Sequence, residues 1–577
     1  MGTLDPILLA VLKGRLEQIS DEMDATLFRS AFNPIIAEAH DASHGLYHAE
    51  TGETLVQGKS GLPVFVGAMS FAVKSVIDKV SAEDLKLNPG DVFIFNDPYE
   101  GGTHLSDFKL VRPFFRDGKL FCFLASVGHW HDVGGNVPGN YNPVATECYQ
   151  EGILIPPVLL YSQGKLNPDI VAILQANSRL PGSLYGDLNG QVSALELGEK
   201  RLNDLLGEYG EYTVTDALAE LKKSAARLME SYISDLPDGT YTAEDWLDND
   251  GISNEPLKIG LDVIIKGGRM TLDFSRTSVA CEGPVNISRS TCIASCYVAL
   301  KHIFREVPAN AGVLEPIDFV LPEDSLLNVG RPKPVGGYTE TILRVIDVMF
   351  QVISQVAPDM TNGCAYGTIN ALSLAGYRQN GARWVMFSFF GGGHGGHPNG
   401  DGLNHGNAPI STATIPPLEI LEAAYPVRFT QWALRPDSGG PGRNRGGCGA
   451  IYEIELMEEK ANAFLFGERG KYPPAGVVGG QPGALNKFYY SDGDDVAEPP
   501  MVSTMVGLNL ERGQRVRLES PGGGGYGDPL EREPEKVAED VRLGYVTAQA
   551  AADHYKCSVS KEGALDQDQT NKMRSGK

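Results

Sequence analysis

The first apolar residues of the chain recur at intervals of three and four positions, and polar residues fill the gaps between them. Asp5-Pro6 supplies a helix N-cap followed by a proline suited to the first turn. The apolar positions are Ile7, Leu8, Val11, Leu12, Leu16, Ile19, Met23 and Leu27. This spacing predicts a long amphipathic helix at the start of the chain.

After Pro34 the apolar runs shorten and are separated by Gly, Asp and Asn, a pattern typical of strands joined by turns. Helical spacing returns further along the chain. Strands are predicted at residues 45–47, 55–56, 91–95, 120–125, 259–264 and 270–274, and helices at residues 216–236, 291–305 and 340–357.

Residues 384–528 alternate short apolar runs with glycine-rich segments, which predicts strands and turns. Residues 533–555 return to helical spacing, and the polar residues 558–577 are expected to fray. We therefore expect a mixed α/β (α+β) multidomain fold. Its four regions are an N-terminal α/β region (1–210), a middle α+β region (211–335), a strand-rich C-terminal region (336–530) and a helical tail with a frayed end (531–577).

The charge of the chain excludes some classes of partner. The formal net charge is -24 and the pI is near 4.9, which argues against binding to nucleic acid or to an anionic membrane. The first residues lack the basic and apolar segments of a signal peptide, and no apolar run approaches about 18 residues. We expect a cytoplasmic protein.

Glycine and cysteine usage refine this picture. Glycine supplies 68 of the 577 residues, well above an average near 7%, and we assign these glycines to turns because they cluster without a period. The eight cysteines form no C-x-x-C pair, so we expect reduced thiols.

Candidate chemistry is densest between residues 95 and 135. His104 and Asp107 are three residues apart, which would turn both side chains to one face of a helical turn, and His129 and His131 would share one face of a strand. Both pairs follow predicted strand ends, where functional sites collect. Imidazole and carboxylate without thiolate suit Zn, Mn or Fe(II). The pattern predicts a divalent metal site, with buried structural histidines as the alternative.

Motifs for nucleotide binding are absent from the sequence. No stretch matches G-x-x-x-x-G-K-[ST], and no G-x-G-x-x-G lies between a clear strand and a helix. Any dependence on ATP must therefore come from elsewhere.

Several short motifs follow one another in a fixed order along nearly the whole chain. They are MDATLFRS at 23–30, EAHD at 38–41, FNDP at 95–98 with GTHLSD at 102–107, QEGI at 150–153, GDL at 186–188, DSGGPGR at 437–443 with RGG at 445–447, and PGGGGYGDP at 521–529. In this order they resemble the hydantoinase B/oxoprolinase family.

The resemblance implies a subunit of an ATP-dependent enzyme. Members open lactams or other cyclic amides, or carboxylate ketones such as acetone. For this chain it implies a cyclic amidohydrolase subunit for a small-molecule substrate, with ATP bound by a hydantoinase A-like partner of kinase-like fold, in a heterotetramer or larger complex. It also implies that Asp41, His104, Asp107 and His129 hold the metal. Asp41 is implied by the resemblance alone.

The same resemblance suggests a mechanism. The partner would phosphorylate the amide or enolate oxygen of the substrate, and the metal site would complete the reaction. His131 or Asp132 would take the proton. In a ketone carboxylase the ion would instead orient an oxygen for attack by an enolate on CO2.

Two departures from the family pattern keep the substrate class open. Hydrolytic members usually carry Asp-Phe-Ser where this chain has HDASH at 40–44, and a segment with two histidines where it has GLPVFVG at 61–67. These differences favour the ketone carboxylase alternative. A third possibility is a non-catalytic scaffold subunit, against which the intact ligand set argues.

Overall fold

The computed structural model describes residues 4–411, 414–493 and 495–575. They divide into two compact units. The first comprises Met1–Thr240, Val263–Tyr338 and Ile410–Pro416, and the second comprises Tyr241–Asp262, Thr339–Pro409 and Pro417–Lys577. Helices alternate with several mostly antiparallel sheets, which confirms the mixed α/β multidomain fold. The division into four regions stays a prediction.

The first unit is built on a seven-stranded sheet in which every neighbouring pair is antiparallel. In spatial order the strands are β2 (Thr54–Gln57), β1 (Ala42–His48), β5 (Lys119–His129), β4 (Asp107–Arg116), β3 (Val92–Phe95), β6 (Val158–Ser162) and β7 (Lys165–Leu166). Strands β4 and β5 form the long central pair.

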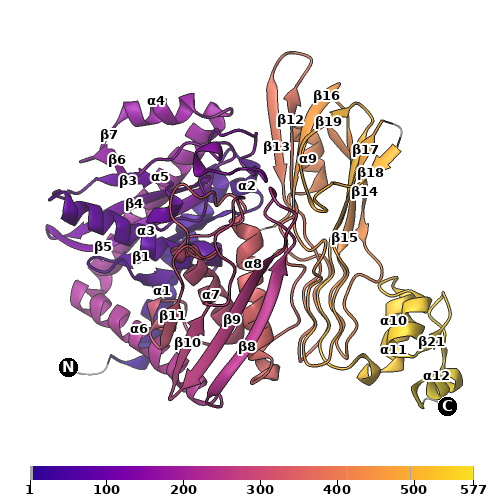
Figure 1. Cartoon of the computed structure of the whole chain (residues 1–577). Coiled ribbons are helices and arrows are strands. Elements are labelled where there is room, and N and C mark those ends of the chain that lie inside the picture. Colours follow the sequence, from indigo (N-terminus) through magenta and orange to yellow (C-terminus); the bar gives the residue numbers. More distant parts are fainter. Residues whose placement is uncertain (1–3, 412–413, 494, 576–577) are drawn as a thin grey trace. The chain divides into compact units, whose positions relative to one another are not determined.

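Helices cover both faces of this sheet. Phe108, Leu110 and Leu124 share one core with α1 and α5. Because side chains alternate along a strand, most odd-numbered residues of β4 and β5 face the other way, toward α3, which packs in turn against α7. Figure 1 shows these elements in indigo to purple, with α7 in rose. The helices of this unit are α1 (Pro6–Ser30), α2 (Pro34–Ala37), α3 (Pro63–Ala82), α4 (Pro168–Ala176), α5 (Pro181–Tyr209), α6 (Glu211–Ser234) and α7 (Arg289–Ile303).

Helix α1 forms where its apolar spacing predicts it. The Asp5 carboxylate caps it by accepting a hydrogen bond from the backbone N–H of Ile7 at 3.0 Å. Its buried face lies against α5, where two glycines permit the close approach. A Cβ atom would lie 2.9 Å from Leu27 Cδ1 at Gly190 and 2.5 Å from Met23 Sδ at Gly198. At Gly186 it would lie 2.5 Å from the ring of Phe32, which follows α1.

A four-stranded sheet has the order β11-β10-β9-β8. Its members are β8 (Gly239–Leu247), β9 (Leu257–Lys266), β10 (Arg269–Asp273) and β11 (Ile317–Val320), and β10 runs parallel to β11. Helix α8 (Tyr338–Ile353) follows. Strands β9 and β10 and helices α6, α7 and α8 lie close to their predicted positions.

Two further sheets of the second unit share one apolar core. One has the order β13 (Arg383–Ser388), β12 (Ala371–Tyr377), β16 (Lys460–Phe466) and β19 (Thr504–Glu511). The other has the order β14 (Val427–Leu434), β15 (Ala450–Leu456), β20 (Arg515–Glu519), β17 (Lys487–Asp492) and β18 (Asp495–Ala497), and α9 (Leu418–Ala424) precedes β14.

The glycine-rich segments of the second unit run alongside one another as extended chains. They hydrogen bond backbone to backbone, as where Gly393 donates to Pro521 at 3.0 Å and Gly523 donates to Gly447 at 3.0 Å. A Cβ atom at Gly393 would lie 1.8 Å from the Gly447 oxygen. The assignment of these glycines to turns is therefore wrong, because the packed segments leave no room for a side chain (Figure 1, below β15).

The chain ends in a small helical subdomain. It contains α10 (Pro534–Arg542), α11 (Ala548–Tyr555), the hairpin of β21 (Ser558–Val559) and β22 (Leu565–Asp566), and α12 (Gln567–Ser575). The expected fraying is not observed over 558–575, because the Thr570 hydroxyl accepts a hydrogen bond from the Ser558 N–H and Arg574 donates to the Tyr555 oxygen. The eight cysteines are buried free thiols. Among the described residues, no helix combines the length and apolar character needed to cross a bilayer.

Candidate metal centre

Asp107 and His129 lie at the end of the central strand pair. Asp107 is the first residue of β4 and His129 the last of β5, and the register pairs them directly. Both are odd-numbered, so their side chains lie on the sheet face toward α3. Asp107 Oδ1 is 3.5 Å from His129 Nδ1.

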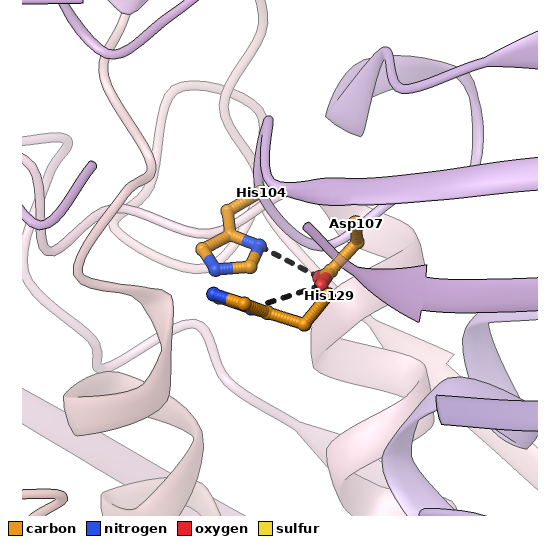
Figure 2. Close-up of side chains that lie close together, drawn as sticks. All are labelled: His104, Asp107 and His129. Carbon is orange, nitrogen blue, oxygen red and sulfur yellow. Dashed lines mark ion pairs between the residues drawn. The ribbon is translucent and has the colours of Figure 1, made fainter. Parts of the chain in front are cut away.

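His104 reaches the same point from the turn before β4. The turn is closed by the Asp107 N–H, which donates to the His104 oxygen at 3.2 Å. A turn thus replaces the predicted helical turn and brings the two side chains together. His104 Nδ1 lies 2.7 Å from Asp107 Oδ2, and Figure 2 shows both imidazoles directed at this carboxylate.

Close packing fixes the turn that carries His104. Gly101 has φ of +86°, and a Cβ atom there would lie 2.2 Å from the Ala72 nitrogen of α3. The Gly102 oxygen accepts a hydrogen bond at 3.0 Å from the Thr291 hydroxyl in the first turn of α7. The imidazole is therefore held on a rigid segment.

Asp41 lies beside this group, immediately before β1. Its backbone oxygen accepts a hydrogen bond from the His129 N–H at 3.1 Å, and its Oδ2 is 3.9 Å from His129 Nδ1. The side chain of Asp41 is 17% exposed, whereas those of His104 and His129 are 2% and 3% exposed. His104, Asp107 and His129 have ligand atoms within 4.8 Å of one another, and Asp41 does not join that closest set among the described residues.

Electrostatics separate the two carboxylates. Burial alone would raise the pKa of Asp107, but the adjacent His104 and His129 outweigh burial and hold that pKa well below its usual range. Burial raises the pKa of Asp41 to about 7, which His129 lowers in part and Asp107 raises further. Asp107 is thus the anionic centre of the group.

The donor set fits a divalent cation. His104 Nε2 and Asp41 Oδ1 are buried and have no hydrogen-bond partner among the described residues. A buried polar atom without a partner costs about 1–3 kcal/mol, which coordination would offset. Two imidazoles and one or two carboxylates without thiolate match zinc, manganese or iron ligation.

His131 and Asp132 lie beyond the end of β5, so the predicted strand face shared by His129 and His131 does not form. Burial lowers the pKa of His131 to about 4, which leaves the ring neutral at pH 7. The Asp132 carboxylate instead accepts hydrogen bonds from the Arg179 backbone N–H at 2.9 Å and from the Arg179 guanidinium at 3.0 Å. Asp132 is thus engaged in holding its own loop.

Three residues around the imidazoles went unpredicted. The His104 ring lies 4.8 Å from the Tyr338 ring and 5.7 Å from the Tyr141 ring. The Thr103 hydroxyl donates to Asp107 Oδ2. Tyr338 is far from His104 along the chain, and only the fold brings them together. Thr103, by contrast, lies within a motif of the predicted site.

Comparisons with known proteins agree along the whole chain. The family model described as Hydantoinase B/oxoprolinase matches residues 5–529. Caprolactamase subunit beta of Pseudomonas jessenii is 32% identical over 100% of both chains. The crystal structure of ATP-dependent caprolactamase from Pseudomonas jessenii matches with a TM-score of 0.90 and 31% identity over 100% of both chains. A nucleotide-free acetone carboxylase structure matches with a TM-score of 0.91 at 20% identity, over 99% of this chain and 83% of that one, a likeness of fold alone.

Proposed function

We propose that this chain, which belongs to the hydantoinase B/oxoprolinase family, is the metal-bearing subunit of an ATP-dependent enzyme complex that opens a cyclic amide. The observation that carries the proposal is the buried group of His104, Asp107 and His129, held at the ends of two paired strands. Likeness over the full length to caprolactamase subunit beta supports a lactam or hydantoin-type substrate.

The residues of this chain would hold zinc or manganese, with iron as the third candidate. His104, Asp107 and His129 supply the inner ligands, and Asp41 completes the set as the most exposed member. When bound, the cation would supply Lewis-acid stabilisation of negative charge and activation of water.

His131 is our candidate proton acceptor. Its ring is buried near His129 and neutral at pH 7, and its Nε2 has no hydrogen-bond partner among the described residues. We do not assign proton transfer to Asp132, because its carboxylate already binds Arg179. Asp132 would instead hold the loop that follows His131.

Phosphoryl chemistry would come from a second polypeptide. The sequence has no phosphate-binding fingerprint, and a relative is named as the beta subunit of caprolactamase. We propose a hydantoinase A-like partner that binds ATP and activates the substrate oxygen, in a heterotetramer or larger assembly.

A ketone carboxylase is the second candidate. It is favoured by the departures at residues 40–44 and 61–67 from the pattern of hydrolytic members. In that case the ion would orient a carbonyl or carboxyl oxygen for carbon–carbon bond formation.

Co-expression with the hydantoinase A-like partner separates these functions. ATP consumption should rise with at least one member of a panel of lactams, hydantoins and 5-oxoproline, with ring opening detected by mass spectrometry. Incorporation of labelled bicarbonate into a ketone would instead establish the carboxylase. No turnover in either assay, with no metal in the purified complex, would leave only a scaffold role.

A further inference from the structure

We infer that Asn33 and Asp187 are positioning residues that set the place of His129 and Asp41 in the metal site. Neither residue is a ligand in this assignment, because Asp187 holds Asn33 and Asn33 holds the backbone of His129. The inference rests on the proposed metal site. It gives a role to Asp187, which lies in the GDL motif at 186–188 and has no part in the proposed chemistry.

The backbone groups of His129 are bound by residues outside the central strand pair. Its N–H donates to the Asp41 oxygen at 3.1 Å, and its oxygen accepts a hydrogen bond from Asn33 Nδ2 at 2.8 Å. Both backbone groups of a strand residue point to the same side, so His129 makes these hydrogen bonds on the side away from β4. The register places His129 opposite Asp107, but residues 33–41 hold it there.

This one segment supplies Asp41 and also holds His129. It begins at Asn33, the N-cap of α2, whose Oδ1 accepts a hydrogen bond from the Ile35 N–H at 2.7 Å. His40, with φ of +60°, then turns the chain, and the Asp41 N–H donates to the Ile35 oxygen at 3.0 Å. The two residues that bind the His129 backbone are therefore tied to each other through Ile35.

Asp187 fixes the start of the same segment. Its Oδ1 accepts hydrogen bonds from the N–H groups of Phe32 at 2.8 Å and Asn33 at 3.2 Å. Asp187 and Asn33 are fully buried, so water does not compete for these contacts. Because α5 packs against both α1 and β5, the carboxylate is carried by an element that is itself held in place.

A carboxamide suits the position of Asn33 because the side chain must donate and accept at once. Nδ2 donates to the His129 oxygen while Oδ1 accepts from Ile35. A serine would keep the cap, since its hydroxyl accepts the same kind of hydrogen bond, but it carries no amide to reach His129. Loss of a group that orients a ligand from outside typically weakens metal binding by about 10–100-fold.

The test measures the dissociation constant for Zn²⁺ by competition with a chelating indicator, using the full chain after metal removal. Asn33→Ser should raise this constant by roughly 10-fold or more. Asp187→Ala should raise it too, because two N–H groups lose their acceptor. Asp187→Asn keeps an acceptor oxygen and replaces only Oδ2, which has no hydrogen-bond partner among the described residues. It should therefore bind Zn²⁺ as the unmodified chain does.

Asn310→Ser is the matched control. Asn310 caps the short helix Ala311–Leu314 of the same unit, where its Oδ1 accepts from the Gly312 N–H at 2.9 Å and its Nδ2 donates to the Leu221 oxygen at 3.3 Å. The change removes the same kind of hydrogen bond, but to the backbone of α6 and not to that of a candidate ligand. It should lower the stability to urea and leave Zn²⁺ binding unchanged.

Unchanged Zn²⁺ binding in Asn33→Ser would overturn the inference while leaving the metal site intact. Equal weakening in Asn33→Ser and Asn310→Ser would also overturn it, because the effect would then come from general destabilisation. Binding as weak in Asp187→Asn as in Asp187→Ala would remove the role of the Asp187 acceptor. Failure of the unmodified chain to bind Zn²⁺ or Mn²⁺ would overturn the proposed metal site itself.

Discussion

Asp107 and His129 are direct cross-strand partners, with Asp107 Oδ1 3.5 Å from His129 Nδ1. In an antiparallel pair, opposite residues on one face are held about 4.5–5.5 Å apart at Cβ, so the sheet itself sets the spacing of these two candidate ligands. The turn before β4 adds His104 to them.

Removing either strand-borne ligand should abolish both turnover and metal-dependent stability. An ion that binds only the native state stabilises it by mass action, by about 2.7 kcal/mol at a concentration of 100 times Kd. We expect Asp107→Ala and His129→Ala to lose this stabilisation, so that their melting temperatures are the same with and without Zn²⁺. Asp78→Ala, an exposed acidic change, should retain it. Full retention of the Zn²⁺ effect in both site variants would contradict the ligand assignment.

His131→Ala should slow turnover while leaving metal content unchanged, because His131 is proposed to handle a proton and not to bind the ion. The comparison requires steady-state kinetics of the complex alongside elemental analysis of the same sample. Loss of the metal would instead identify His131 as a ligand.

Asp132→Ala should act through stability. The change removes the carboxylate that pairs with the Arg179 guanidinium and leaves the Arg179 backbone N–H without its acceptor inside a partly buried loop, although the guanidinium keeps the Gly134 and Gly135 oxygens. We expect a loss of about 1–3 kcal/mol in the free energy of unfolding, measured by urea denaturation. A stable variant with no turnover would restore Asp132 as a catalytic candidate.

Gly393→Ala should be strongly destabilising. Its Cβ atom would lie 1.8 Å from the Gly447 oxygen, so neighbouring backbone must move, at a cost of at least about 2 kcal/mol. Gly207→Ala in α5 is the matched control, because nothing lies within 4 Å of its Cβ position. The control should gain about 0.5–1 kcal/mol from helix propensity. Equal melting temperatures for the two variants would contradict the packing of the glycine-rich segments.

Much of the first unit could be predicted from its sequence, because periodic burial leaves a periodic pattern. Helix α1 is such a case, with Leu12, Leu16, Met23 and Leu27 on its buried face. Helix α3 was missed because its first half is apolar on nearly every side, so no period is visible. Helix α5 was missed because its glycines resemble turn residues, whereas Gly190 and Gly198 allow α1 to pack closely against it.

The candidate site was predictable only in part. The spacing of His104 and Asp107 predicts that their side chains lie together. Strand β4 was not predicted, so the pairing of Asp107 with His129 could not be derived. Pro113 disguises β4, since proline is rare within sheets. It is tolerated here because the pairing of β3 with β4 ends at Val111, before Pro113 is reached. Nothing in the sequence around Tyr338 predicts its place beside His104, because that place depends on the whole fold.

Glu151, which fixes the turn before Tyr338, should make stability depend on pH. Burial raises the pKa of Glu151 from 4.5 to about 8, although the N–H groups of Val335 and Gly336 lower it in part. The native state therefore keeps a proton that the unfolded chain releases near pH 4.5. The contribution of Glu151 to the free energy of unfolding is fully present below that pH and is lost as the pH rises through about 8.

Glu151→Gln carries a permanently neutral group and should remove this dependence. At about pH 5 the variant should be no more stable than the unmodified chain, because Gln cannot accept both backbone hydrogen bonds. As the pH rises toward 8, the difference in the free energy of unfolding should shift steadily in favour of the variant. Only the unmodified chain must then either bury a charged carboxylate or take up a proton on folding. Urea denaturation across this range measures the difference. Glu50→Gln, at an exposed position, should run parallel to the unmodified chain. A Glu151→Gln curve equally parallel to it would show that Glu151 is already ionised in the native state.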